Sequence, residues 1–341
     1  MIIRSKAPLR LGLAGGGTDV SPYSEMYGGA ILNATISRYA FCTIIPTDDG
    51  IITINARDQQ QEINYPSSLT LPFDGKLDLI KGVYNRIVKD FGSKALSFRM
   101  DTFVDAPPGS GLGSSSTLVV AIIGAFAEWL RIPLGEYDIA QLAYSIERED
   151  LGYAGGKQDQ YAATFGGVNF MEFHENGKVI VNPLRIKDMV MHELQHNLIL
   201  FNTETSRLSS TIIEEQAKNV KEKNEKSIEA MHQLKQQAIQ MKEALLTAKV
   251  DSIGEVLHFG WQQKKRMAAN ISNTLIDAIY EKAIAAGATG GKISGAGGGG
   301  FMTFYAPANK KYDVVNLLSS VGGTVINYNF VSEGLVTWTT N

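Results

Sequence analysis

The chain has 341 residues, of which 44% are hydrophobic and 20% are charged. A chain of this length and composition can bury a sizeable core, most simply in two domains. Its formal net charge of −3 is small, so we expect no nucleic-acid partner. A single cysteine, Cys42, excludes an internal disulfide. Because the start lacks the pattern of a signal peptide and no apolar run reaches the roughly 18 to 20 residues that span a bilayer, we expect a cytoplasmic protein without a membrane partner.

The first half of the sequence is rich in predicted strands. Partial alternation of apolar and polar residues predicts strands of one sheet over 2–14, 30–46, 51–65 and 96–107. Apolar stripes at helical spacing predict helices over 76–91, from about 114, and over 136–150. Two short strands, 168–174 and 178–184, then flank a Glu-Asn-Gly turn.

The second half changes character near residue 185. A predicted strand over 196–203 leads into a long polar helix, in which apolar and small residues recur at steps of four and three from Ile213 to Leu245. This seam predicts packing on the chain's own domain or, alternatively, an intermolecular coiled coil. Helices over 251–269 and 272–286 follow, and the chain ends with a strand, a helix and two strands, which indicates an α+β domain.

A glycine-rich turn joins the strand 96–107 to the next helix. Residues 107–116 read PPGSGLGSSS, and a small apolar stretch follows them. Glycines let a backbone approach an anion closely, and the first N–H groups of a helix face the charge. The serine hydroxyls add donors and hard oxygens for a metal ion. Since the pattern is neither the common P-loop nor a dinucleotide fingerprint, it predicts a phosphate site of another kind.

A second glycine cluster lies at 290–307 and contains a formal dinucleotide pattern at Gly295, Gly297 and Gly300. We reject that interpretation, because a strand rather than a helix is predicted after the glycines. The loop can lie against a ligand or another loop, or it can be a tight turn between domains.

Three motifs occur in a characteristic order: KAPLRL leading to GGGTD over 6–19, PPGSGLGSSS over 107–116, and KISGAGGGGF over 292–301. In this order and rough spacing they resemble the motifs of the GHMP kinases over nearly the whole chain. The resemblance implies an ATP-dependent small-molecule kinase with a two-domain α+β fold. A ribosomal protein S5 domain 2-like ATP-binding domain would cover 1–185, and a ferredoxin-like α+β domain would cover 186–341.

The resemblance also implies site residues. The loop around the ATP phosphates would comprise Pro107, Gly109, Ser110, Gly111, Leu112, Gly113, Ser114, Ser115 and Ser116. Ser115 and Glu147 match the residues that bind Mg²⁺, which prefers hard oxygen ligands. Asp159, twelve residues after Glu147, matches the catalytic aspartate, and Arg10 matches the cation that pairs with it or with the transferred phosphoryl group. Gly297 and Gly298 match the loop beside the phosphates and the substrate.

These residue types suit phosphoryl transfer, which requires in-line positioning and neutralisation of charge on the phosphoryl oxygens. A sugar hydroxyl must also lose its proton, and a carboxylate such as Asp159 can accept it as general base. Each acid has an alternative interpretation. Asp159 can be a helix-capping or salt-bridged residue, and Glu147 can belong to a solvated, charged helix end.

Departures from the family pattern bear on the acceptor. Galactokinases carry Gly-Glu-His-Thr-Asp in the first motif, where this chain has glycines at Gly16 and Gly17 and keeps Thr18 and Asp19. We expect these four residues to contact the sugar. With GGKQDQY at 155–161, the pattern most resembles the kinases of D-glycero-D-manno-heptose 7-phosphate, which form the 1,7-bisphosphate for surface polysaccharide. The alternatives are a fucokinase- or galactokinase-like sugar 1-kinase and, in another class, a non-catalytic sugar or ATP sensor.

A phosphorylated sugar needs an anion site of its own. Arg207 follows a predicted strand among hydroxyl residues, where a guanidinium suits bidentate phosphate contact, or it is a solvated arginine at a helix start. Lys157 either binds this phosphate or orients Asp159. The sequence leaves the oligomeric state open.

Overall fold

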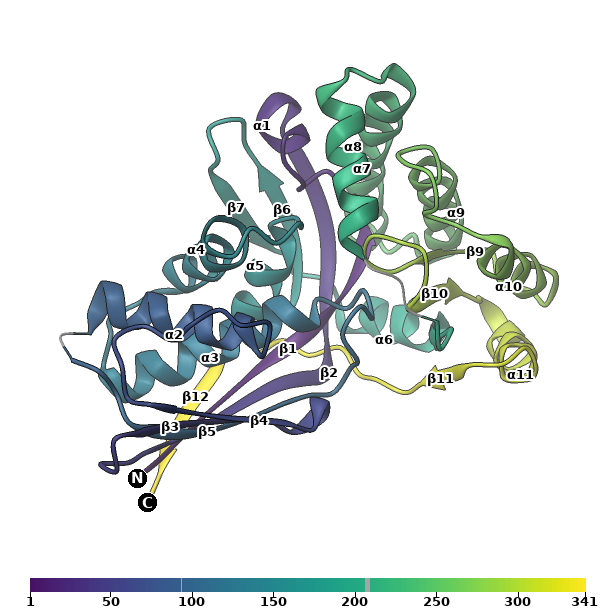
Figure 1. The fold of residues 1–341 in the computed structure, drawn as a ribbon. Helices are drawn as coiled ribbons and strands as arrows, with labels where there is room; N and C mark the ends of the chain where they lie inside the picture. Colours follow the sequence, from purple (N-terminus) through teal and green to yellow (C-terminus); the bar gives the residue numbers. More distant parts are fainter. Residues whose placement is uncertain (93, 206–208) are drawn as a thin grey trace.

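The computed structural model describes residues 1–92, 94–205 and 209–341, and within these ranges the chain forms two β-sheets (Figure 1). The larger sheet lies on the left of Figure 1 and the smaller one on the right. The two termini lie side by side, because β12 at the end of the chain pairs with β1 at its start.

In the described residues the larger sheet has eight strands in the order β12-β1-β2-β5-β3-β4, with β6 on β2 and β7 on β6. Their bounds are β1 (Ile2–Ala14), β2 (Gly29–Pro46), β3 (Ile51–Ala56), β4 (Gln61–Pro66), β5 (Phe98–Val104), β6 (Val168–Phe173), β7 (Val179–Pro183) and β12 (Val336–Thr340). One end of β2 pairs with β5 and the other with β6, so the β1–β2 ladder bridges both parts of the sheet.

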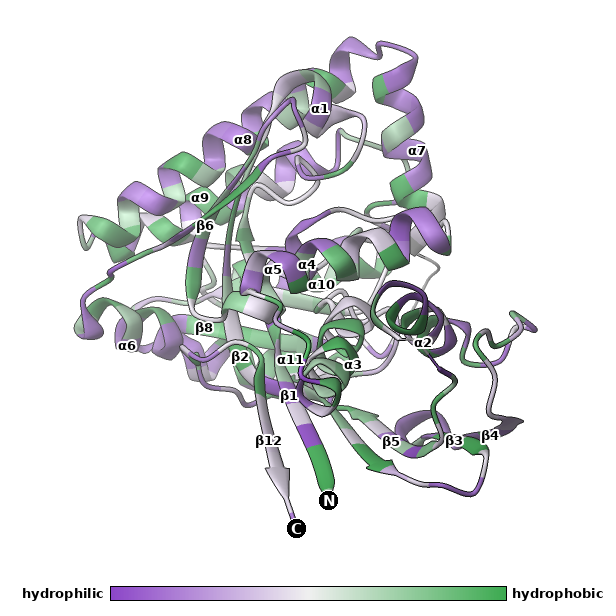
Figure 2. Ribbon diagram, turned by 90° about the vertical axis from the view of Figure 1, so that its left-hand side faces the viewer, coloured by the Kyte–Doolittle hydropathy of each residue, from purple (hydrophilic) through white to green (hydrophobic). Residues whose placement is uncertain are grey.

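The helices between residues 23 and 197 include two that pack directly on β1 and β2 of this sheet. Their bounds are α1 (Tyr23–Tyr27), α2 (Asp78–Phe91), α3 (Ser114–Leu130), α4 (Glu136–Ser145), α5 (Gln158–Phe165) and α6 (Asp188–Asn197). Helix α3 contacts β1 and β2 and is buried along most of its length, since it is apolar almost all round (Figure 2). Helix α5 contacts the same two strands, which brings its N-terminus close to the start of α3.

The smaller sheet has the strand order β11-β8-β10-β9 in the described residues, and its ladders are antiparallel. Its strands are β8 (Leu198–Asn202), β9 (Gly290–Ile293), β10 (Phe301–Tyr305) and β11 (Thr324–Ile326). The remaining helices are α7 (Ser209–Lys221), α8 (Glu225–Leu246), α9 (Ile253–Lys264), α10 (Thr274–Ala285) and α11 (Lys311–Ser320). A sheet of this order with helices after its first and third strands is the ferredoxin-like arrangement, which confirms the predicted α+β class.

Helices α8 and α9 connect the two sheets through the core. Ala238 and Met241 of α8 belong to the apolar cluster of the larger sheet, whereas Met231 and Leu234 of the same helix belong to that of the smaller sheet. This double contact fixes α8 and α9 against β1, next to the first sequence motif. No helix in the described ranges is long and apolar enough to cross a membrane.

Three expectations about elements need correction. Residues 51–65 form two strands rather than one, because Arg57–Gln59 is a 3₁₀ turn and Gln60 adopts a left-handed conformation. The long polar helix is two helices, with Asn224 capping α8 through a hydrogen bond from the Ser227 N–H.

The seam of α8 is buried within the chain itself, as the first of the two interpretations predicted. The division at residue 185 stays a prediction, but β12 lies in the first sheet rather than with the rest of 186–341.

Candidate active site

A cleft of about 640 Å³ lies where the three sequence motifs meet, a volume suited to small-molecule ligands. It is lined by the first motif, the glycine-rich loop before α3, the segment from Glu147 to Asp159, helix α7, the end of α9, β9 and the loop after β9. The predicted residues that line it are Arg10, Gly16, Gly17, Asp19, Gly109, Gly111, Gly113, Ser114, Ser115, Ser116, Glu147 and Asp159.

The glycine-rich loop before α3 has the geometry of an anion cradle. Gly109, Gly111 and Gly113 have φ of 76°, 79° and 81°, a backbone region that residues other than glycine rarely adopt. Helix α3 begins at Ser114 without a side-chain cap on its N-terminus, so its first N–H groups are available to a ligand. Ser115 is exposed at the cleft. Of the other predicted loop residues, Pro107 is outside the lining, and Ser110 and Leu112 are buried beneath it.

The third motif packs on this cradle, which explains part of its glycine content. A Cβ on Gly111 would lie 2.6 Å from the carbonyl oxygen of Ser294, and one on Gly300 would lie 2.7 Å from that of Ser110. The loop therefore lies against another loop, one of the interpretations that the sequence left open. Gly295 and Ala296 line the cleft. Gly297 and Gly298, which we expected at the substrate, contact Ile271 instead.

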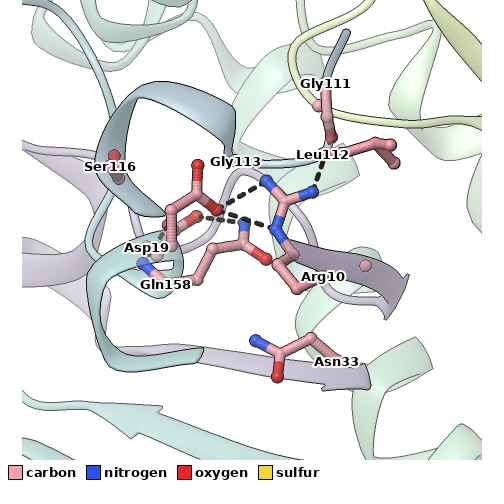
Figure 3. Close-up of polar contacts among 12 residues, drawn as sticks. Arg10, Asp19, Asn33, Gly111, Leu112, Gly113, Ser116 and Gln158 are labelled. Atoms are coloured by element: carbon pink, nitrogen blue, oxygen red, sulfur yellow. Dashed lines mark hydrogen bonds and ion pairs between the residues drawn. The ribbon is translucent and has the colours of Figure 1, made fainter. Parts of the chain in front are cut away.

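Arg10 joins Asp159 to the cradle. Its Nε and Nη2 approach the same carboxylate oxygen, Oδ1 of Asp159, at 2.7 and 2.5 Å. Its Nη1 donates to the carbonyl of Gly111 at 2.6 Å (Figure 3). Arg10 is buried, because β1 runs beneath both the cradle and α5. A Cβ on Gly113 would lie 3.2 Å from Cγ of Asp159, so a glycine there lets the carboxylate approach the start of α3. Within the described residues no hydrogen bond reaches Oδ2 of Asp159.

Glu147 lies on a π-helical turn, Ile146–Asp150, that extends α4. It lines the cleft but is 98% buried, so it does not belong to a solvated helix end. Burial raises the pKa of Glu147, while Arg148 and hydrogen bonds from Ser116 and Gln160 act in the opposite direction. Glu147 and Ser115 both line the cleft and provide hard oxygens, which magnesium prefers together with substrate phosphates. The side chains present therefore fit this ion.

Asp19 is held by the backbone opposite Arg10. Its Oδ2 accepts a hydrogen bond from the N–H of Gln158 at 3.0 Å, and its Oδ1 accepts one from that of Gly17 at 3.3 Å (Figure 3). Burial raises the pKa of Asp19. The hydrogen bond from the Gln158 N–H lowers this pKa, whereas the negative charge of Asp159 raises it further. A Cβ on Gly156 would overlap Oδ2 of Asp19, so this glycine is required for the approach.

Two predicted substrate residues are placed elsewhere. The hydroxyl of Thr18 lies within hydrogen-bond distance of the carbonyl oxygens of Gly15 and Ala30, so it stabilises the turn instead of facing the cleft. The ammonium of Lys157 pairs with Glu25 at 2.6 Å and does not line the cleft. A phosphate contact by Lys157 therefore has no support. Arg207 lies outside the described residues.

The cleft also contains polar residues that the sequence analysis missed. Lys264 of α9 and Lys292 of β9 are buried lining residues, and so is Gln216 of α7. Lys292 is the first residue of the third motif, three positions before Gly295, and this position is a weak signal. Lys264 stands in a Lys-Lys-Arg run that resembles a solvated helix end, so only packing distinguishes it from Lys265.

The chain belongs to the GHMP kinases. The model of the family's N-terminal domain matches residues 78–167, and that of the C-terminal domain matches residues 241–323. The chain is 52% identical to the D-glycero-alpha-D-manno-heptose 7-phosphate kinase of Campylobacter jejuni, over 98% of each chain. It is thus a kinase by family, and the family implies ATP as the phosphoryl donor.

Further similarities agree with this assignment. A crystal structure described as a D-glycero-D-manno-heptose 1-phosphate kinase from Bacteroides thetaiotaomicron matches with a TM-score of 0.86 and 47% identity, over 99% of each chain. The bifunctional fucokinase/GDP-fucose pyrophosphorylase of Arabidopsis thaliana is 26% identical over 89% of this chain, which spans 30% of that protein. A galactokinase structure from Lactococcus lactis, at 17% identity and a TM-score of 0.79, shares the fold.

Proposed function

We propose that the protein transfers the γ-phosphoryl group of ATP to the anomeric O1 of D-glycero-D-manno-heptose 7-phosphate. The product is the 1,7-bisphosphate, a precursor of GDP-heptose for surface polysaccharide. The observation that carries the proposal is the 52% identity to the Campylobacter jejuni heptose 7-phosphate kinase over 98% of both chains. The two heptose kinases above are described with the substrate phosphate on different carbons, so the position of transfer is the property to test.

The donor end of the proposed site is the cradle at 107–116. Its glycines and the free N-terminus of α3 support binding of the ATP phosphates. Glu147 and Ser115 would hold Mg²⁺, which neutralises charge on phosphate oxygens when it is bound. Ser116 and Gln160 support Glu147, since Gln160 Nε2 donates to both the Ser116 hydroxyl and the Glu147 carboxylate.

Asp159 is the proposed general base. Arg10 occupies only Oδ1, which leaves Oδ2 able to accept the proton of the anomeric hydroxyl. The guanidinium fixes the orientation of the carboxylate and also lies beside the cradle, through Gly111, where the transferred group passes. This arrangement supports positioning and charge stabilisation as the main sources of rate enhancement.

The experiment incubates the pure protein with Mg-ATP and a panel of heptose 7-phosphate, heptose 1-phosphate, fucose, galactose, mannose and mevalonate. Phosphorus NMR then locates the new phosphate. We expect turnover of heptose 7-phosphate, with a new signal coupled to the anomeric proton. Transfer to fucose or galactose but not to heptose 7-phosphate would establish the sugar 1-kinase alternative. Nucleotide binding without turnover of any sugar would establish the sensor.

A further inference from the structure

Two buried lysines face the cleft without a counter-ion. Lys264 is 4% exposed and Lys292 is 7% exposed. Within the described residues neither forms an ion pair, and each makes one hydrogen bond, to a carbonyl: Lys264 to Gly295 and Lys292 to Gly12. An ammonium group has three donors, so two on each lysine remain for a ligand.

The two ammonium groups converge on one place. A Cβ on Gly16 would lie 3.8 Å from Nζ of Lys264 and 3.9 Å from Nζ of Lys292. The missing side chain at Gly16 therefore leaves the space between α9 and β9 open to a ligand. A longer side chain at this position would occupy the space next to both ammonium groups.

A third donor stands beside them. Gln216 is 98% buried and lines the cleft, and its Nε2 has no hydrogen-bond partner in the described residues. A Cβ on the adjacent Gly17 would lie 3.8 Å from the amide oxygen of Gln216. A buried amide donor without an acceptor costs free energy unless a ligand supplies one.

The electrostatics around Lys264 and Lys292 favour binding of an anion. Burial lowers the pKa of Lys264 to about 8, and the charge of Arg10 acts in the same direction while that of Asp19 opposes it. Burial also lowers the pKa of Lys292, and Lys264 and Arg10 lower it further. Cations that are desolvated and placed near other cations are costly, and an incoming anion offsets this cost.

We infer that Lys264, Lys292 and Gln216 form the binding site for the phosphate that the acceptor sugar already carries. This inference rests on the proposed function and replaces Lys157 as a candidate. The residues of this site come from α7, α9 and β9, whereas the ATP cradle precedes α3. A phosphate there would place the far end of the sugar against charge-assisted donors.

The experiment measures binding of heptose 7-phosphate without ATP, by calorimetry, to the wild type, K264M and K292M. Methionine keeps the length of the side chain but removes the charge. We expect the Kd to rise roughly ten- to hundredfold in each variant, as for loss of a hydrogen bond to a charged group. Inorganic phosphate should compete with the sugar phosphate in the wild type and lose this effect in both variants. K265M is the matched control, because Lys265 is next in sequence but pairs with Asp277, and its Kd should stay within about twofold of the wild type.

Other outcomes would show that the two lysines do not bind the phosphate of the acceptor sugar. If the Kd for heptose 7-phosphate is unchanged while kcat falls, the lysines serve the phosphoryl group in transfer and the inference is wrong. Thermal unfolding identifies a variant that does not fold, and K264R, which keeps a cation, should then restore part of the affinity. The substrate panel tests the proposed function separately: a wild type that turns over heptose 7-phosphate, with variants of unchanged Kd, overturns the anion site alone.

Discussion

The two ends of the cleft are built in different ways. The proposed donor end is one continuous stretch, residues 107–116, whose glycines and serines line the cleft at the start of α3. The acceptor end brings together Gly16, Gln216, Lys264 and Lys292, which are far apart in the sequence. The proposed donor end therefore depends on one short segment of backbone and hydroxyl groups, while the proposed acceptor end depends on side chains that packing positions. Arg10 donates a hydrogen bond to the cradle at Gly111, and Asp159 lies next to Gly113 of the cradle.

The largest expected effect concerns Asp159, the proposed general base. Asp159→Asn removes the proposed base and should lower kcat by about 10²- to 10⁴-fold, because the acceptor hydroxyl loses its proton acceptor. Nucleotide affinity should change little, since the cradle is untouched. Steady-state kinetics and nucleotide titration measure the two effects. Asp150→Asn is the control, because Asp150 is exposed and pairs with Arg86, and full activity in the Asp159 variant would remove its assigned role.

The second prediction tests the donor end. Glu147→Gln removes the charge from the proposed metal ligand, so the magnesium concentration for half-maximal activity should rise about tenfold or more. The apparent affinity for heptose 7-phosphate should stay within about twofold. Activity measured against magnesium concentration provides the test, with Glu149→Gln, on the exposed side of the same turn, as the control. An equal response of both variants would contradict the assignment.

The third prediction concerns the contact between the two glycine loops. Gly111→Ala introduces a Cβ at a positive φ of 79° and 2.6 Å from the carbonyl oxygen of Ser294. Gly177→Ala, at a φ of 81° with no heavy atom within 4 Å, introduces backbone strain alone. We expect the free energy of unfolding to fall by about 1 kcal/mol for Gly177→Ala and by a further 1 to 3 kcal/mol for Gly111→Ala. Chemical denaturation measures both, and equal losses would mean that the loops can move apart without cost.

The smallest expected effect is a pH dependence of the acceptor end. Lys264 binds an anion only when protonated, and its pKa is about 8, so kcat/KM for heptose 7-phosphate should fall as pH rises from 7 to 9, by roughly tenfold. Arg10, Asp19 and Lys292 are the charged groups near this ammonium group. Unphosphorylated heptose, tested in parallel, should not show this dependence. The same alkaline profile for both sugars would place the titrating group outside the phosphate site.

Much of the fold could be predicted from local patterns. Alternation located β1 and β2 within a residue of their observed bounds, and the apolar stripe located α2 within two residues. The pattern failed where a short break interrupts it: the 3₁₀ turn at Arg57–Gln59 divides one predicted strand, and Asn224 divides one predicted helix. It also missed that β12 returns to β1, because strand pairing between chain ends leaves no local signal.

By itself the sequence determined which segment is the proposed donor end of the site. A phosphate cradle needs glycines and a helix start in immediate succession, so the whole feature is visible in ten consecutive residues. Only the tertiary structure decided the acceptor end. Lys157 and Lys264 are the same residue type in the sequence. In the folded chain Lys157 forms an ion pair with Glu25, whereas Lys264 lies buried beside Gly16 without a counter-ion in the described residues. The energy of a charged group depends on its surroundings, and those surroundings come from distant parts of the chain.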